Sequence, residues 1–168
     1  MYPYLKLLLV SPGEITVYGS DFSFYVREGD AVIAPTDVPV GVRTSGGAVY
    51  TEITTERGSY MNKAVKIGEA FKLASLVPYQ EGKIVNMDVV HNDKMKFVIM
   101  AFDAGTGLSE HAAPGEAIVF ALDGEAVIGY EGVMHKVKAG ECFSFAKGGK
   151  HFVKATGRFK MALLLTLE

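Results

Sequence analysis

Two histidines in the carboxyl-terminal half of the chain lie in glycine-bounded segments that could bring them together. His111 lies in GTGLSEHAAPGEAIVFALDG, residues 105–124, and His151 ends GECFSFAKGGKH, residues 140–151. Imidazole nitrogens are common ligands of Fe, Mn, Ni and Zn, and they also provide polar groups in small-molecule sites. Two neutral ligands alone hold such ions loosely. The pair therefore indicates either part of a metal site or the polar groups of a small-molecule pocket.

The segments that would position these histidines have the composition of short strands. Glycine is frequent, at 19 of 168 residues, and the stretches between glycines are rich in Val, Ile, Phe, Tyr and Thr. Strand patterns occur at 14–19, 22–26, 31–35, 49–55, 96–103, 116–122, 125–130, 141–146 and 159–167. The one helical pattern, residues 61–77, has Gly68 in its middle, which disfavours a continuous helix. The sequence therefore predicts an all-β protein.

A weak internal repeat runs through the chain at a constant offset of 111 residues, which lays residues 14–56 on residues 125–167. Its matches include Val26 with Val137 and Gly29 with Gly140. The repeat predicts an incomplete half-unit at 1–56, a connector at 57–75 and a complete unit at 76–168. A half-barrel leaves strand edges open, which predicts a homodimer that covers them.

The spacing around His111 resembles the first motif of the cupin family, which consists of a glycine, two histidines, a glutamate and a second glycine at fixed intervals. Gly105, five residues, His111, one residue, Ala113, three residues, Ala117, six residues and Gly124 reproduce those intervals. Only the first histidine of the motif is kept, because alanines stand at the positions of the second histidine and the glutamate.

The segment before His151 resembles the second cupin motif. Gly140, five residues, Ala146, one residue, Gly148, two residues and His151 keep the glycines and the histidine of that motif. Ala146 replaces its proline, and Ala155 replaces its asparagine.

The resemblance covers residues 76–168 well and residues 5–56 weakly. It implies a cupin-type double-stranded β-helix, a jelly-roll barrel of the small RmlC-like kind, with an N-terminal half-barrel extension. In metal-binding cupins, the ligands of both motifs surround one divalent ion inside the barrel. This chain offers only His111 and His151 at those positions, so the resemblance implies no cofactor or a weakly bound divalent transition metal.

Glu116 is the carboxylate that could complete a metal site with His111 and His151. It lies one residue from the ligand position at Ala117, and alternation along a strand directs it to the opposite face. A bulge after the turn at residues 114–115 could re-aim it.

Small apolar residues near the histidines predict a roomy barrel interior of the kind that binds small molecules. Alternation places Ala113, Ala117 and Val119 on the same face as His111, and the resemblance implies that His151 lies in the same barrel mouth. The predicted wall of this ligand pocket consists of Met100, Phe102, Phe159 and Met161.

Three further reactive side chains are predicted to be structural. His91 and His135 lie in the polar stretches VVHNDK and GVMHKVK and are expected at the surface. Cys142 alternates with Phe143 and Phe145 and is expected to be buried as a small apolar residue.

Charge and hydropathy argue against two classes of partner. Lys and Arg number 17 against 19 Asp and Glu, for a net charge of −2, and no basic cluster is present, so nucleic-acid binding is not expected. The apolar run near the N-terminus is too short for a signal sequence or a membrane span. A single cysteine is typical of a reducing compartment, so a cytoplasmic location is expected.

These features favour a protein that binds a small organic molecule or an anion in its barrel, in a sensor or accessory role, with a degenerate metal site. One alternative is a metal-dependent cupin enzyme of isomerase or dioxygenase type that uses His111 and His151. Another is a purely structural dimer module. The cupin resemblance does not choose among them, because that fold hosts isomerases, oxygenases, storage proteins and regulators.

Overall fold

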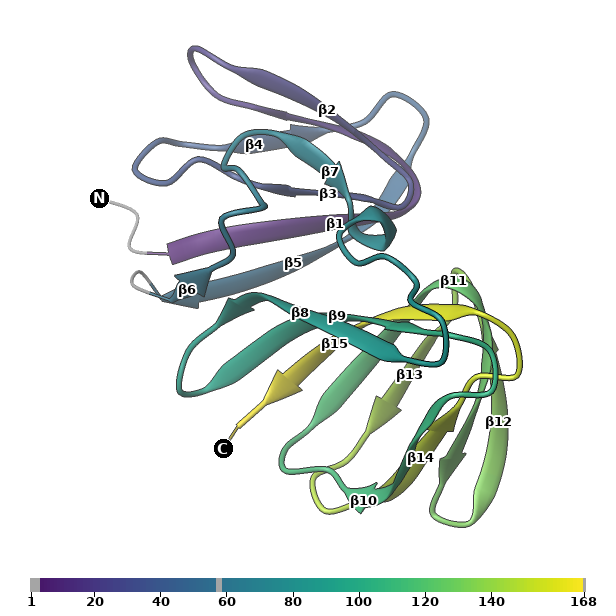
Figure 1. The fold of residues 1–168 in the computed structure, drawn as a ribbon. Coiled ribbons are helices and arrows are strands. Elements are labelled where there is room, and N and C mark those ends of the chain that lie inside the picture. Colours follow the sequence, from purple (N-terminus) through teal and green to yellow (C-terminus); the bar gives the residue numbers. More distant parts are fainter. Residues whose placement is uncertain (1–3, 57–58, 168) are drawn as a thin grey trace. The chain divides into compact units, whose positions relative to one another are not determined.

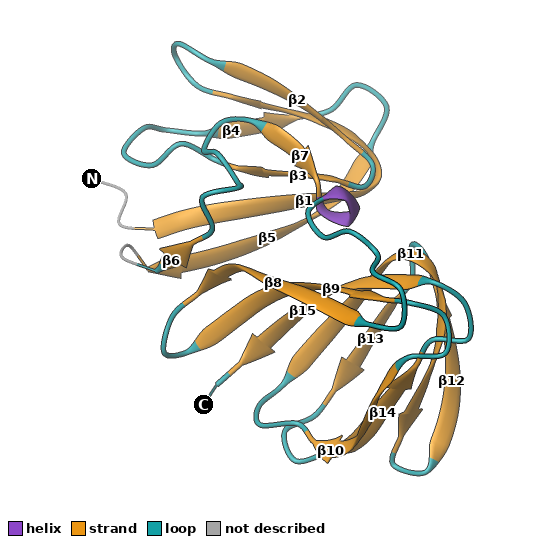
Figure 2. Cartoon of the chain, in the orientation of Figure 1, coloured by secondary structure: helices purple, strands orange, loops and turns teal. Residues whose placement is uncertain are grey.

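A computed structural model of the chain describes residues 4–56 and 59–167. Strands make up nearly all of its regular structure, and the one helical element of the described part is the 3-10 turn η1, Leu73–Ser75 (Figure 2). In that part of the chain, no helix has the length and apolar character needed to cross a membrane. The chain divides into two compact units, Met1–Leu73 and Ala74–Glu168.

The first unit is built around one long strand that pairs with four others (Figure 1). Its strands are β1 (Tyr4–Tyr18), β2 (Ser23–Arg27), β3 (Asp30–Ile33), β4 (Gly41–Arg43), β5 (Ala48–Glu56), β6 (Tyr60–Met61) and β7 (Ala70–Lys72). β1 pairs antiparallel with β2, β3, β4 and β5, and β7 adds to the far edge of β3.

The second unit repeats this plan and extends it into a jelly roll. Its strands are β8 (Ile84–His91), β9 (Met95–Phe102), β10 (Gly107–Ala112), β11 (Ala117–Tyr130), β12 (Val133–Lys138), β13 (Cys142–Phe145), β14 (Lys150–Lys154) and β15 (Phe159–Thr166). One layer has the order β13-β11-β15-β9-β8, and the other has the order β12-β11-β14-β10. β11 belongs to both layers, so the sheet curls into a barrel, and the all-β jelly-roll prediction is confirmed.

The internal repeat is confirmed at the level of strand register. The pairings of β1 with β2 to β5 recur in β11 with β12 to β15 at the same offset of 111 residues, apart from two pairs at the end of β5. Examples are Glu14 opposite Arg27 and Glu125 opposite Lys138, Leu7 opposite Ile33 and Ile118 opposite Ser144, and Val17 opposite Val42 and Ile128 opposite Val153.

A glycine at the same place in each unit allows the long strand to pass from one layer to the other. The register shifts between Val10 and Gly13 in β1, and between Ala121 and Asp123 in β11. Gly13 has a φ of 95° and Gly124 a φ of 70°, a backbone region that favours glycine. A Cβ at Gly124 would also collide with the carbonyl oxygen of Arg158. The repeated glycine is therefore a requirement of the bend.

The expected connector, residues 57–75, begins with residues 57–58, which lie outside the described part. From residue 59 onwards it forms β6, β7 and η1. The pattern over 61–77 therefore does not form a continuous helix. Gly68 has a φ of 76°, and its amide donates to the carbonyl of Ile33, 2.8 Å away, which directs the segment along β3.

Candidate functional site

The two predicted histidines lie directly opposite each other inside the second unit. β10 pairs with β14 so that His111 faces His151, and β14 pairs with β11 so that Tyr130 lies on the other side of His151. Directly paired residues of antiparallel strands share a face, so the three side chains form one row. The two imidazole centroids are 4.2 Å apart, with 54° between the ring planes.

The hydrogen bonds of the two rings are alike, although their exposure differs. His151 is 7% exposed, whereas His111 is open to solvent. Nδ1 of His111 lies 2.8 Å from the carbonyl oxygen of Ser109, and Nδ1 of His151 lies 3.1 Å from that of Gly149. A carbonyl only accepts, so each Nδ1 carries the proton and each Nε2 is left as an acceptor in the neutral ring.

The pKa of His151 lies below its ordinary value. Burial is the largest cause, because it penalises the charged ring, and the nearby His111 acts in the same direction. The hydrogen bond to the Gly149 carbonyl opposes both effects. His151 therefore favours the neutral form at neutral pH.

Aromatic rings pack beneath the histidines. The ring of Phe145 stacks on His151 with centroids 4.0 Å apart and 26° between planes, and Phe145 is paired with Ala117 across β13 and β11. Tyr130 contacts Phe145 edge-on at 5.5 Å, and Phe143 lies 5.3 Å from Phe145. The face shared by Ala117 and His151, where a family ligand set would converge, therefore holds a phenyl ring.

The apolar side chains of the barrel interior are fully buried at one end and become less buried toward the other. At the fully buried end, Phe102 and Phe159 are directly paired. Met100 and Met161 form the next pair, at 8% and 2% exposed, and beyond them Val98 and Leu163 are only partly buried. Val119 is fully buried, whereas Ala113 and Ala117 are 3% and 5% exposed. The predicted pocket residues thus share the inner face with the histidines, and the apolar ones among them are packed into a core.

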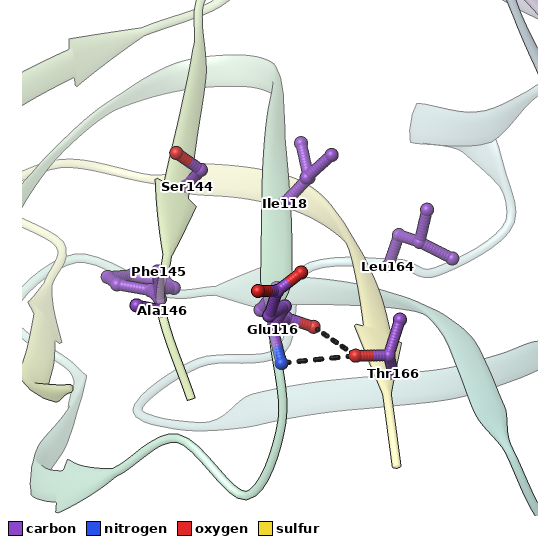
Figure 3. Close-up of a pocket in the computed structure, with 8 residues that line it drawn as sticks. Glu116, Ile118, Ser144, Phe145, Ala146, Leu164 and Thr166 are labelled. Carbon is purple, nitrogen blue, oxygen red and sulfur yellow. Dashed lines mark hydrogen bonds between the residues drawn. The ribbon is translucent and has the colours of Figure 1, made fainter. Parts of the chain in front are cut away.

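A resident metal ion does not fit this donor set. Within residues 4–56 and 59–167, no group of three or more His, Cys, Asp or Glu side chains could hold a metal ion. Glu116 is exposed and neighbours the inward-facing Ala117, so alternation directs it to the outer face, and the structure does not bring it to the two imidazoles. Its amide donates to the hydroxyl of Thr166 at 3.1 Å, which fixes the strand end in this orientation (Figure 3).

A cavity of about 370 Å³ lies on the outer side of the same strands (Figure 3). Glu116, Ile118, Ser144, Ala146, Leu164 and Thr166 line it, together with Ala117 and Phe145. Ile118 is directly paired with Ser144 on one side and with Leu164 on the other, so these three side chains form one row across β13, β11 and β15. Sequence reasoning about the motif histidines did not predict this groove.

One expectation about a single residue is wrong. His135 and His91 were expected at the surface, and both are partly exposed; the ring of His135 also packs against Phe143 at 4.8 Å. Cys142 was expected to be buried, but it is exposed. Phe143 and Phe145 take the inner face of β13, and alternation leaves Cys142 on the outer one.

Comparisons with known proteins agree with this architecture. Residues 98–167 match the family model of the cupin domain. A cupin 2 conserved barrel domain protein from Leptotrichia buccalis is 29% identical, with 96% of this chain and 73% of that chain covered and a TM-score of 0.81. A putative glyoxylate induced protein from Pseudomonas aeruginosa is 20% identical over 98% of this chain and 66% of its own, with a TM-score of 0.63, and shows the fold alone.

A comparison with curated proteins gave no match. The barrel topology and the structure of the protein from Leptotrichia buccalis agree with the matched domain, so residues 98–167 are assigned to a cupin domain.

Proposed function

We propose that the second unit binds a small organic molecule at the end of its barrel where His111 and His151 accept hydrogen bonds from it. The observation that carries this proposal is the shared arrangement of the two rings. Each Nδ1 is engaged by a backbone carbonyl, which leaves two Nε2 acceptors on neighbouring rings.

The surroundings of the imidazoles define the class of molecule. Phe145 and Tyr130 offer ring surfaces beside His151, and the inner face toward Val98 and Leu163 is apolar and partly exposed. A flat or apolar body with a hydroxyl or amide donor matches both features. An anion fits less well, because the lowered pKa of His151 favours an uncharged ring at neutral pH.

A metal-dependent enzyme has less support from this geometry. Ala113 and Ala117 supply no ligand, Glu116 lies on the outer face, and Phe145 occupies the inner face beside His151. We therefore propose a sensor or accessory role. The homodimer and the cytoplasmic location stay predictions.

Side-chain NMR tests the proposal with three probes, phenol, benzyl alcohol and benzoate. The two alcohols should shift the ring resonances of His111 and His151 in a saturable manner at neutral pH, and benzoate should do so less. His151→Phe keeps an aromatic ring but removes one acceptor, and it should weaken binding of the alcohols. Replacement of His91, on β8, serves as the matched control. Equal binding of benzoate, or no shift at either histidine, would contradict the proposal.

A further inference from the structure

The first unit shows what can occupy the far edge of the third strand in this repeat. β7 pairs antiparallel with β3, with Phe71 opposite Ala31 and Lys72 opposite Asp30. Lys72 Nζ lies 3.2 Å from the Asp30 carboxylate. Just upstream, Ile67 forms an isolated parallel bridge with Ile33, outside the antiparallel pairing of β3 and β7. The segment of residues 67–72 therefore lies along β3, and Ala31 and Ile33 beside it are fully buried.

The second unit has the same edge, and none of its described residues, 74–167, forms such a segment there. At the offset of 111 residues, β13 corresponds to β3, Glu141 to Asp30, Cys142 to Ala31 and Ser144 to Ile33. Within residues 59–167, β13 pairs with β11 alone. Glu141, Cys142 and Ser144 are all exposed. An uncovered edge presents backbone donors and acceptors that another strand can use.

The groove beside this edge can receive side chains of an added strand. Ser144 lies both on the edge strand and in the wall of the groove (Figure 3). A residue that took the place of Ile67 would lie beside Ser144, which is directly paired with Ile118, and Ile118 is 40% exposed. Glu141, the residue before β13, and Glu116 in the groove add two exposed carboxylates to these surroundings.

We propose that β13 and the adjoining groove bind an extended segment of a partner protein by strand addition. The segment carries an apolar residue beside Ser144 and a lysine or arginine opposite Glu141, as residues 67 and 72 do at β3. Main-chain hydrogen bonds to the edge give affinity in this mode of recognition, and the groove and the acidic residue give selectivity. The row of Ser144, Ile118 and Leu164 lies on the outer face of these strands, and the groove shares Phe145 with the histidine site.

A peptide with the sequence of residues 64–73, AVKIGEAFKL, is the probe, because the chain itself uses that segment at the equivalent edge. Titrated into the isotope-labelled full chain, it should shift the backbone amides of Cys142, Phe143 and Ser144 and the methyl groups of Ile118 in a saturable manner. Glu141→Lys should weaken binding about fivefold, because a like-charge pair replaces an attractive one. A peptide in which the residue corresponding to Lys72 is glutamate should restore binding to that variant.

Glu110→Lys is the matched control, since Glu110 is an exposed carboxylate on β10, and it should leave binding unchanged. A scrambled peptide of the same composition should not bind. Equal binding of the scrambled peptide, or no shift, would overturn the proposal. Shifts confined to the edges of β3, β10 or β12 would overturn it as well, because the peptide would then use another edge. Failure of the charge exchange would remove the assigned role of Glu141 and with it the predicted basic residue.

Discussion

His111 and His151 lie directly opposite each other on β10 and β14, with ring centroids 4.2 Å apart, yet only His151 is buried. The two rings therefore contribute differently to the protein. His151 stacks on Phe145 and belongs to the packing of the barrel, whereas His111 covers it from the solvent side.

Replacing each histidine by alanine should separate these contributions. His151→Ala removes a ring packed on Phe145, and it should lower the free energy of unfolding by about 2 kcal/mol. His111→Ala should change it by no more than about 0.5 kcal/mol, as is usual for an exposed side chain. Urea denaturation of both variants measures the difference. Equal losses would show that the two rings are packed alike.

Stability should fall on acidification because the pKa of His151 is lowered in the folded state. Its ordinary value is 6.5, so the unfolded chain takes up the proton at a higher pH than the folded chain does. The contribution of His151 to the free energy of unfolding is therefore complete above pH 6.5. It is lost as the pH falls from that value through the lower pKa of the folded state. Denaturation from pH 8 to pH 5 should show a shallower pH dependence for His151→Phe than for the wild type. Identical slopes would contradict a lowered pKa.

The repeat and the fold were predictable because the positions of glycines and the alternation of apolar residues can be recognised in the sequence. The bend at Gly13 and the bend at Gly124 both require glycine. The two glycines therefore keep the offset of 111 residues even where the side chains around them differ. The motif intervals likewise placed His111 and His151 together.

The filling of the barrel could not be predicted in the same way. Motif spacing shows where ligands are missing, but it does not show that Phe145 occupies the space beside His151. Cys142 was expected to be buried with Phe143 and Phe145, although strict alternation in β13 places it on the opposite face from both. The outer groove depends on which strands lie beside β13 in the sheet. The spacing of strand patterns along the sequence does not determine this strand order.

Two glycines of the second unit should respond differently to alanine, although both have a positive φ. Gly132 has a φ of 80° and open space around the position of a Cβ, so Gly132→Ala should cost about 1 kcal/mol for the backbone conformation. Gly124 has a φ of 70° and would bring its Cβ against the Arg158 carbonyl, so Gly124→Ala should cost about 3 kcal/mol. Chemical denaturation gives both values. Similar costs would mean that the bend tolerates a side chain.

Restoration of the missing metal ligands tests whether the barrel keeps the geometry of a cupin metal site. The wild type should bind Ni²⁺ or Zn²⁺ weakly, because two imidazoles supply half of a four-ligand shell. Ala113→His with Ala117→Glu adds one imidazole and one carboxylate on the inner face. Ala117 is paired with Phe145, however, so the new glutamate meets the phenyl ring and the gain should be small.

Adding Phe145→Ala to these two changes removes that ring and should raise affinity for the metal by about two orders of magnitude or more over the wild type. Isothermal titration with Ni²⁺ or Zn²⁺ measures the metal affinity of the wild type, the double variant and the triple variant. Phe145→Ala alone is the control for the space that removal of the phenyl ring opens. No gain in the triple variant would show that β10 and β14 have diverged from the metal-binding geometry. Tight binding by the wild type would show instead that a further group of this chain completes the site, and it would favour the metal-dependent enzyme over the binding protein proposed above.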